Sequence, residues 1–200
     1  MSQYFDNDQD VKNKDILVNY TFAGSNFSLM SNNGIFSKSK LDDGSRVLLK
    51  AITKIPHKGK ILDLGCGIGV IGLTDCIINK EESFYTLVDI NKTAVTLATN
   101  NAARLHCENK VEVLYSDIFS AIDDKKFNYV LLNPPIRAGK SVIYKMFSDS
   151  FIHLIDGGSL IIVIRKSHGA ESASKYLSSI YSSVSLIYRE HGYYVYEAKK

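Results

Sequence analysis

The stretch Asn133-Pro134-Pro135 begins at the last residue of the apolar run NYVLLN, at the end of a predicted buried strand. Proline donates no backbone hydrogen bond, so two consecutive prolines end the strand and leave the neighbouring carbonyl groups unpaired. The nitrogen of a planar exocyclic amine is a poor nucleophile because its lone pair is delocalised. Hydrogen bonds from such an amine to the Asn133 side-chain oxygen and the Pro134 carbonyl would orient the nitrogen and stabilise the charge that develops on it. The motif therefore predicts a catalytic site for transfer to an amine, formed by Asn133, Pro134 and Pro135, with no metal.

A glycine loop, residues 65–69, follows the predicted strand KILDL and leads into a helix. Glycine permits positive φ angles and close approach of the backbone to a ligand, and the free N–H groups at a helix start favour a negative group. Asp89 ends the next predicted strand, twenty residues after Gly69, where a carboxylate that binds both hydroxyls of a ribose is expected. The loop residues predicted to contact a cofactor are Gly65, Cys66, Gly67 and Gly69.

Such a loop fits either a dinucleotide or S-adenosylmethionine. Asp63 favours the second, because a carboxylate there would lie poorly beside a pyrophosphate but well beside a cationic amino group. Asp117 ends the third predicted strand and would accept a hydrogen bond from an adenine amino group, although a helix cap is the alternative interpretation. Ile90 and Ile118, each next to one of the later aspartates, complete the predicted site for S-adenosylmethionine.

The spacing of apolar runs predicts the fold. Continuous apolar or β-branched segments indicate central strands over residues 60–65, 85–90, 111–117, 128–133 and 159–166. Segments with helical spacing alternate with them, so the sequence predicts an α/β, Rossmann-like fold with a mainly parallel sheet. Two alternating strands around His191-Gly192 predict a C-terminal antiparallel hairpin. All the motifs above fall at carboxyl ends of parallel strands, where ligands bind in open α/β sheets.

A chain of 200 residues with 45% hydrophobic content is ordinary for one domain, which we expect over residues 15–200. Residues 15–55 are expected to form a small appendage, a β-hairpin followed by a helix over 43–52, and residues 1–14 a flexible tail. Three widely spaced cysteines form no Cys-x-x-Cys pattern, and the five histidines show no metal-ligand spacing. With no apolar run of about 18 residues, we expect a cytoplasmic protein without a membrane span.

Positive charge is concentrated in two segments. Residues 38–60 contain seven lysines and arginines against two aspartates, and residues 137–145 contain three with no acid. We predict that Lys38, Arg137 and Lys140 contact the phosphates of a nucleic acid, the alternative being that they are solvated surface charges.

Two blocks of the sequence, NGIFSKSKLDDGSRVLL (33–49) and NPPIRAGK (133–140), resemble the "methyltransferase small" domain family of class I S-adenosylmethionine-dependent methyltransferases, typified by a ribosomal RNA guanine-N2 methyltransferase. The resemblance implies that Gly65, Gly67, Asp89, Asp117 and Asn133 line the cofactor site and that Phe36 and Ser37 lie near its mouth. It also implies that the acceptor is an exocyclic amine of RNA, with guanine N2 of ribosomal RNA as the first expectation.

The residue after Asn-Pro-Pro helps to distinguish between possible methyl acceptors. Adenine-N6 and protein-glutamine methyltransferases usually have an aromatic residue there that stacks on the target, whereas this chain has Ile136. Phe36 is a candidate for the missing stacking partner, or else a core residue. Because related methyltransferases use Asp-Pro-Pro, aspartate at position 133 is expected to keep more activity than alanine. A non-catalytic cofactor-binding subunit and a nicotinamide oxidoreductase remain as further hypotheses, and the sequence leaves monomer and homodimer open.

Overall fold

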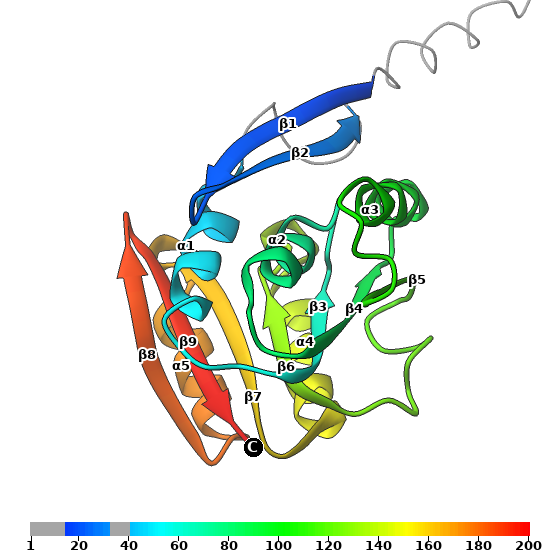
Figure 1. Ribbon diagram of the computed structural model, residues 1–200. Helices are drawn as coiled ribbons and strands as arrows, with labels where there is room; N and C mark the ends of the chain where they lie inside the picture. Colours follow the sequence, from blue (N-terminus) through cyan, green and yellow to red (C-terminus); the bar gives the residue numbers. More distant parts are fainter. Residues whose placement is uncertain (1–14, 33–40) are drawn as a thin grey trace, which may run out of the picture.

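The computed structural model describes residues 15–32 and 41–200. Its centre is a seven-stranded sheet in the order β5-β4-β3-β6-β7-β9-β8 (Figure 1). The strands are β3 (Gly59–Leu64), β4 (Ser83–Asp89), β5 (Val111–Tyr115), β6 (Phe127–Leu132), β7 (Leu154–Arg165), β8 (Ser183–Glu190) and β9 (Tyr193–Lys199). The five strands from β5 to β7 pair in parallel, and β9 runs antiparallel to both of its neighbours. The predicted Rossmann-like sheet with a C-terminal hairpin is confirmed.

Helices cover both faces of this sheet. The helices are α1 (Asp43–Ile52), α2 (Val70–Ile78), α3 (Lys92–Arg104), α4 (Lys140–His153) and α5 (Ala170–Ser178). Buried side chains of α1, α2 and α3 belong to one hydrophobic cluster, and those of α4 and α5 to a second. Neighbouring residues of β3 alternate between the clusters, with Ile61 in the first and Leu62 in the second. Burial on both faces explains why the central strands are continuously apolar rather than alternating.

The start of β7 differs from the sequence prediction. The strand begins at Leu154, directly after α4, and not at residue 159. Phe127 pairs with Leu154 and Tyr129 with Ser159, so the partner strand shifts register between these two pairs. The intervening residues include Gly157-Gly158, which have the composition of a turn. They form instead an irregularity within the strand, in which Gly157 is exposed and Gly158 is buried.

The N-terminal hairpin consists of β1 (Asp15–Phe22) and β2 (Ser25–Asn32) and lies beside α2 and α3 (Figure 1). Hydrogen bonds as well as apolar contacts hold the hairpin against the rest of the domain. The Asn101 side chain, on α3, accepts the Met30 N–H at 2.7 Å and donates to the carbonyls of Met30 and Ile68, both at 3.0 Å. One amide thus joins β2, α3 and the glycine loop. The predicted hairpin and the helix over 43–52 are present, whereas the predicted tail, residues 1–14, lies outside the described residues.

Among residues 15–32 and 41–200, no helix combines the length and the apolar character needed to cross a membrane.

Candidate functional site

The sequence motifs gather at the carboxyl edge of the parallel strands. Asp63 of β3 is in register with Leu131 of β6, so the loops after these two neighbouring strands begin side by side. On the other side of β3, the Gly67 N–H donates to Oδ2 of Asp89, at the end of β4, over 2.8 Å. The glycine loop, Asp89 and Asn133 therefore occupy one edge of the sheet.

The loop conformation requires its glycines. Gly65, Gly67 and Gly69 have left-handed φ angles of 75°, 56° and 86°. A Cβ atom on Gly69 would lie 2.7 Å from the Leu73 side chain, because α2 packs closely against the loop. At Gly67, by contrast, no described residue beyond its chain neighbours comes within 4 Å of the Cβ position. A ligand has room to approach the main chain there.

Asp63 is a buried carboxylate with one oxygen unused. Its side chain is 1% exposed, and Oδ2 accepts the Gly72 N–H at 2.8 Å. Oδ1 is buried and has no hydrogen-bond partner among the described residues. Burial raises the pKa of Asp63 to about 7, and the charges of Asp89 and Asp75 contribute in the same direction. An orphaned, destabilised carboxylate at the base of a ligand-binding loop fits a cationic ligand, which would supply the missing partner.

Asp89 retains capacity to bind hydroxyl groups. Each of its oxygens accepts one backbone N–H at 2.8 Å, from Gly67 and from Asn91. A carboxylate oxygen accepts two hydrogen bonds, so both oxygens can accept another. The next residue, Ile90, is 59% exposed and provides apolar surface beside this carboxylate.

Asp117 does not cap a helix. Residues 117–121 form turns, so the cap interpretation is wrong, and the exposed Asp117 backbone N–H donates to the Ser120 hydroxyl at 3.1 Å. Ile118 beside it has a left-handed φ of 53°, which β-branched residues seldom adopt. The Ser116 hydroxyl donates to the Ile118 carbonyl at 2.9 Å and holds this conformation. Backbone strain of this kind is concentrated at ligand-binding sites.

The half-buried Asn133 lies directly after β6. Its side-chain nitrogen donates to Asp42 Oδ1 at 3.2 Å and to Ser45 Oγ at 3.1 Å, both at the start of α1. No described residue donates to its side-chain oxygen. Pro134 is buried, and its carbonyl receives no backbone hydrogen bond from the described residues, whereas the Pro135 carbonyl accepts the Ala138 N–H. Two adjacent acceptors are thus available at the end of the strand.

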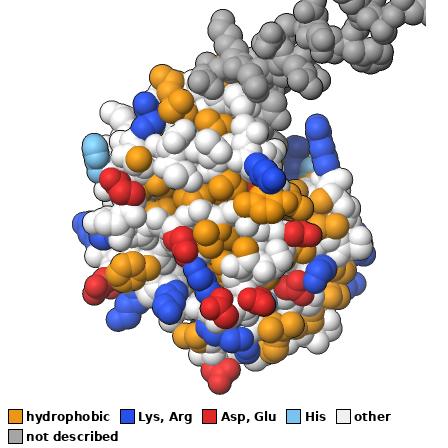
Figure 2. Space-filling model, turned by 90° about the vertical axis from the view of Figure 1, so that its right-hand side faces the viewer, with side chains coloured by type: hydrophobic (Ala, Val, Ile, Leu, Met, Phe, Trp, Pro, Cys, Tyr) orange, Lys and Arg blue, Asp and Glu red, His pale blue; other side chains and the backbone are white. Residues whose placement is uncertain are grey.

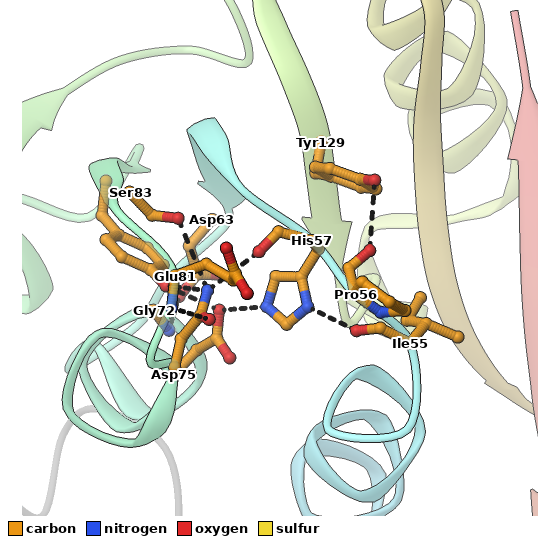
Figure 3. A network of polar contacts seen from close by, with 11 residues as sticks. Ile55, Pro56, His57, Asp63, Gly72, Asp75, Glu81, Ser83 and Tyr129 are labelled. Atoms are coloured by element: carbon orange, nitrogen blue, oxygen red, sulfur yellow. Dashed lines mark hydrogen bonds and ion pairs between the residues drawn. The ribbon is translucent and has the colours of Figure 1, made fainter.

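A buried polar network around Asp75 of α2 was missed by the sequence analysis, which gave His57 no role. His57 Nε2 lies 2.9 Å from Asp75 Oδ2 and Nδ1 lies 3.0 Å from the Ile55 carbonyl oxygen (Figure 3). Burial lowers the pKa of His57, but the hydrogen bond and charge of Asp75 outweigh it and raise the pKa overall. Asp75 is on α2, one turn after Gly72, so its contact with His57 anchors the helix whose first turn contacts Asp63. The detectable signal was an aspartate within the apolar run of that helix.

Basic side chains flank Asn133. Arg137 and Lys140 are exposed, and neither forms an ion pair with a described residue. Arg165, the last residue of β7, and Lys166 directly after it are exposed in the same way. Lys50, from the other basic segment, is instead paired with Glu190 at 2.8 Å. On the face that bears α3 and β5, acidic and basic side chains alternate (Figure 2), so that face offers no surface of one sign.

The remaining predicted contacts are only partly described. Ile136 is 39% exposed, at the start of the 3₁₀ turn Ile136–Ala138. Phe36, Ser37 and Lys38 lie outside the described residues. Within the described ranges, no group of three or more histidine, cysteine, aspartate or glutamate side chains is arranged to hold a metal ion.

A hollow of about 400 Å³ lies at the opposite, amino edge of the strands, lined by Phe84, Glu112 and Lys125 among others. None of the residues of the motifs contributes to it. We assign the functional site to the carboxyl edge because the orphaned Asp63 oxygen and the free acceptors of Asn133 and Pro134 are there.

Parallel strands that end in a glycine loop and acidic turns, closed at one edge by an antiparallel pair, are the architecture of class I S-adenosylmethionine-dependent methyltransferases, and the protein is an enzyme of this class. The model of the family described as "Methyltransferase small domain" matches residues 26–197, and the chain belongs to that family.

Relatives of two kinds match the sequence. "Uncharacterized protein YbxB" of Bacillus subtilis is 37% identical over 198 residues, which is 98% of both chains. "Ribosomal RNA small subunit methyltransferase C" of Pasteurella multocida is 36% identical over 136 residues, which is 65% of this chain and 39% of that protein. "Ribosomal RNA large subunit methyltransferase G" of Pseudomonas syringae is 28% identical over 96% of this chain and 51% of its own length. The chain therefore spans two fifths to one half of these two ribosomal RNA methyltransferases.

Among solved structures, the T. thermophilus 16S rRNA N2 G1207 methyltransferase (RsmC), in complex with AdoMet and guanosine, has a TM-score of 0.82 and 20% identity. The match covers 93% of this chain and 50% of that one. A methyltransferase from Pyrococcus furiosus has a TM-score of 0.65 at 18% identity, over 75% of this chain and 79% of that one. At these identities the likeness establishes the fold.

Proposed function

We propose that this protein transfers a methyl group from S-adenosylmethionine to an exocyclic amine of RNA, with guanine N2 of ribosomal RNA as the target. The observation that carries the proposal is the pair of free acceptors after β6, the Asn133 side-chain oxygen and the Pro134 carbonyl. They lie next to a loop whose buried carboxylate lacks a partner. The names of the two ribosomal RNA methyltransferase relatives and the guanosine in the T. thermophilus complex support the choice of RNA and guanine.

The cofactor, when bound, supplies an electrophilic methyl group on a sulfonium. Asp63 would bind its ammonium group, Asp89 the two ribose hydroxyls, and Asp117 the adenine amine, with Ile90 and Ile118 as apolar contacts of the ring. The open backbone at Gly67 would allow the close approach that these contacts need.

Asn133 and Pro134 would act on the acceptor. Their two oxygens accept the N–H groups of the target amine, hold its nitrogen toward the methyl group and stabilise the positive charge that grows on the nitrogen. The amine loses a proton after transfer, so the side chains need not include a strong base. Ile136 provides no stacking surface, which disfavours DNA adenine and protein glutamine as targets.

The partner surface would be the basic rim around Asn133. Arg137 and Lys140 on one side and Arg165 and Lys166 on the other are exposed cations that suit phosphate groups. Three free buried thiols, Cys66, Cys76 and Cys107, suit a reducing compartment, and we propose the cytoplasm. The proposal is independent of whether the protein is a monomer or a homodimer.

The test is methyl transfer from tritiated S-adenosylmethionine to RNA, DNA and protein fractions of cells that lack this gene, with Asn133→Ala as the matched control. We expect labelled RNA with the unaltered protein only. Label in protein or DNA, or equal labelling by the variant, would contradict the proposal. Tight binding of NADH without binding of S-adenosylhomocysteine would overturn the assignment of the cofactor.

A further inference from the structure

The Asn133 side chain is held by the start of α1, which is remote in the sequence. Its nitrogen donates both N–H groups, one to Asp42 Oδ1 at 3.2 Å and one to Ser45 Oγ at 3.1 Å. Asp42 is the N-cap of α1, and the same Oδ1 also accepts the Ser45 N–H at 2.9 Å. Gly44, between them, packs against the amide, since a Cβ atom there would lie 3.1 and 3.2 Å from its nitrogen and oxygen.

The chemistry of Asp42 decides which way the amide faces. An asparagine amide has two orientations that differ by exchange of its nitrogen and oxygen, and a hydroxyl such as that of Ser45 can pair with either. A carboxylate only accepts hydrogen bonds, so the Asn133 atom beside Asp42 must be the nitrogen. The oxygen is then the amide atom that is not bonded to Asp42 or Ser45, and no described residue donates to it.

We infer that Asp42 is a positioning residue that orients the Asn133 amide so that its oxygen faces the target amine. This inference rests on the proposed function of Asn133. In the opposite orientation the amide would present its own N–H groups to those of the target, and both the hydrogen bond and the stabilisation of the developing charge would be lost. Ser45 and Gly44 support the arrangement, the first as a second acceptor and the second by leaving room for the amide.

Capping of α1 alone does not account for these residues. Any serine, threonine or asparagine would cap the helix. Gly44 is in the first helical turn without a positive φ, where alanine would favour the helix by up to about 1 kcal/mol. Gly44 thus disfavours helix α1 at the point where the helix contacts the Asn133 amide.

Two substitutions separate capping from orientation. Asp42→Ser keeps a capping oxygen but is too short to reach Asn133, whereas Asp42→Asn keeps an oxygen of the same reach that the Ser45 N–H holds in place. For Asp42→Ser we expect kcat on RNA to fall about tenfold to a hundredfold, with KM for RNA and affinity for S-adenosylhomocysteine within about twofold. Asp42→Asn should retain most of the kcat of the unaltered protein. Equal kcat for Asp42→Ser and the unaltered protein would overturn the inference.

A double-mutant cycle adds a test that a general structural effect would fail. If Asp42 acts through Asn133, Asp42→Ser should cause no further loss of kcat in an Asn133→Ala background. Gly44→Ala should lower kcat although the melting temperature is unchanged or higher. Additive losses in the cycle would instead show that Asp42 serves the fold, and would contradict its role in positioning.

A measurement without substrate distinguishes failure of this inference from failure of the proposed function. Hydrogen exchange of the Asn133 side-chain amide, followed by NMR, should be slow in the unaltered protein and in Asp42→Asn, and at least tenfold faster in Asp42→Ser. If the unaltered protein methylates no RNA but this pattern is found, the proposed function fails and the orientation by Asp42 stands. Equal exchange in all three proteins would overturn the orientation itself.

Discussion

Asp63 accepts the Gly72 N–H at 2.8 Å through one carboxylate oxygen, while its other oxygen is buried with no partner among the described residues. The first contact ties β3 to the first turn of α2 and leaves the second oxygen without a hydrogen bond. Because burial raises the pKa of Asp63 to about 7, this carboxyl group is partly protonated near neutral pH, and a bound cationic ligand would favour its ionised form.

The first prediction concerns pH. Below about pH 7 Asp63 is neutral, so the ammonium group of the ligand loses its counter-charge, and affinity for S-adenosylhomocysteine should rise from pH 5.5 to 7.5. Because ligand binding is coupled to the loss of one proton, the affinity can change by at most about tenfold per pH unit. Titration calorimetry at three pH values measures this pH dependence of the affinity. Asp63→Asn should bind more weakly at pH 7.5 and show little pH dependence, whereas a flat profile for the unaltered protein would exclude Asp63 as the ammonium site.

The second prediction concerns the ribose. Asp89→Ala removes charge-assisted hydrogen bonds and should weaken binding of S-adenosylhomocysteine by about 1.5 to 3 kcal/mol. Because Asp89 also accepts the Gly67 and Asn91 N–H groups, the melting temperature of the variant is measured in parallel. Unchanged affinity in a folded variant would refute the assignment.

The third prediction concerns RNA. Changing Lys38, Arg137 and Lys140 together to alanine should weaken RNA binding and flatten its dependence on salt, because fewer counterions are released, while cofactor affinity stays the same. The matched control changes Lys50, Lys125 and Lys145 to alanine, which removes the same charge from lysines already paired with Glu190, Glu112 and Asp149. Equal salt slopes for the two triple variants would show that the first set has no special role.

The fourth prediction concerns aspartate at position 133. From the sequence alone, Asn133→Asp is expected to keep more activity than Asn133→Ala. The contact between Asn133 and Asp42 reverses this expectation, because the substitution sets two carboxylates against each other at about 3 Å. We expect Asn133→Asp to be no more active than Asn133→Ala at pH 7.5. Adding Asp42→Asn should relieve the repulsion and raise the activity of Asn133→Asp, and no change on adding it would contradict this explanation.

The sequence predicts most of the fold because each strand is an apolar run between turn residues, and the loops after the parallel strands carry the glycines and aspartates. It misplaces the start of β7 because Gly157-Gly158 has the composition of a turn, although β6 pairs with the strand on both sides of it, at Leu154 and Ser159. The His57–Asp75 and Asn133–Asp42 contacts join residues 18 and 91 positions apart. Their partners are chosen by tertiary packing, which local patterns do not specify.

The central claim is that Asn133 promotes methyl transfer to an exocyclic amine of RNA. Losing one preorganised hydrogen-bond partner of a developing charge costs about 2.7 to 4 kcal/mol, roughly a hundredfold to a thousandfold in rate. The most direct measurement is mass-spectrometric nucleoside mapping of ribosomal RNA from cells that lack the gene, after incubation with S-adenosylmethionine and either the unaltered protein or Asn133→Ala. We predict N2-methylguanosine at one position with the unaltered protein and a rate at least about a hundredfold lower with the variant. No new methylated nucleoside with the unaltered protein, or equal rates for the two proteins, would contradict the account.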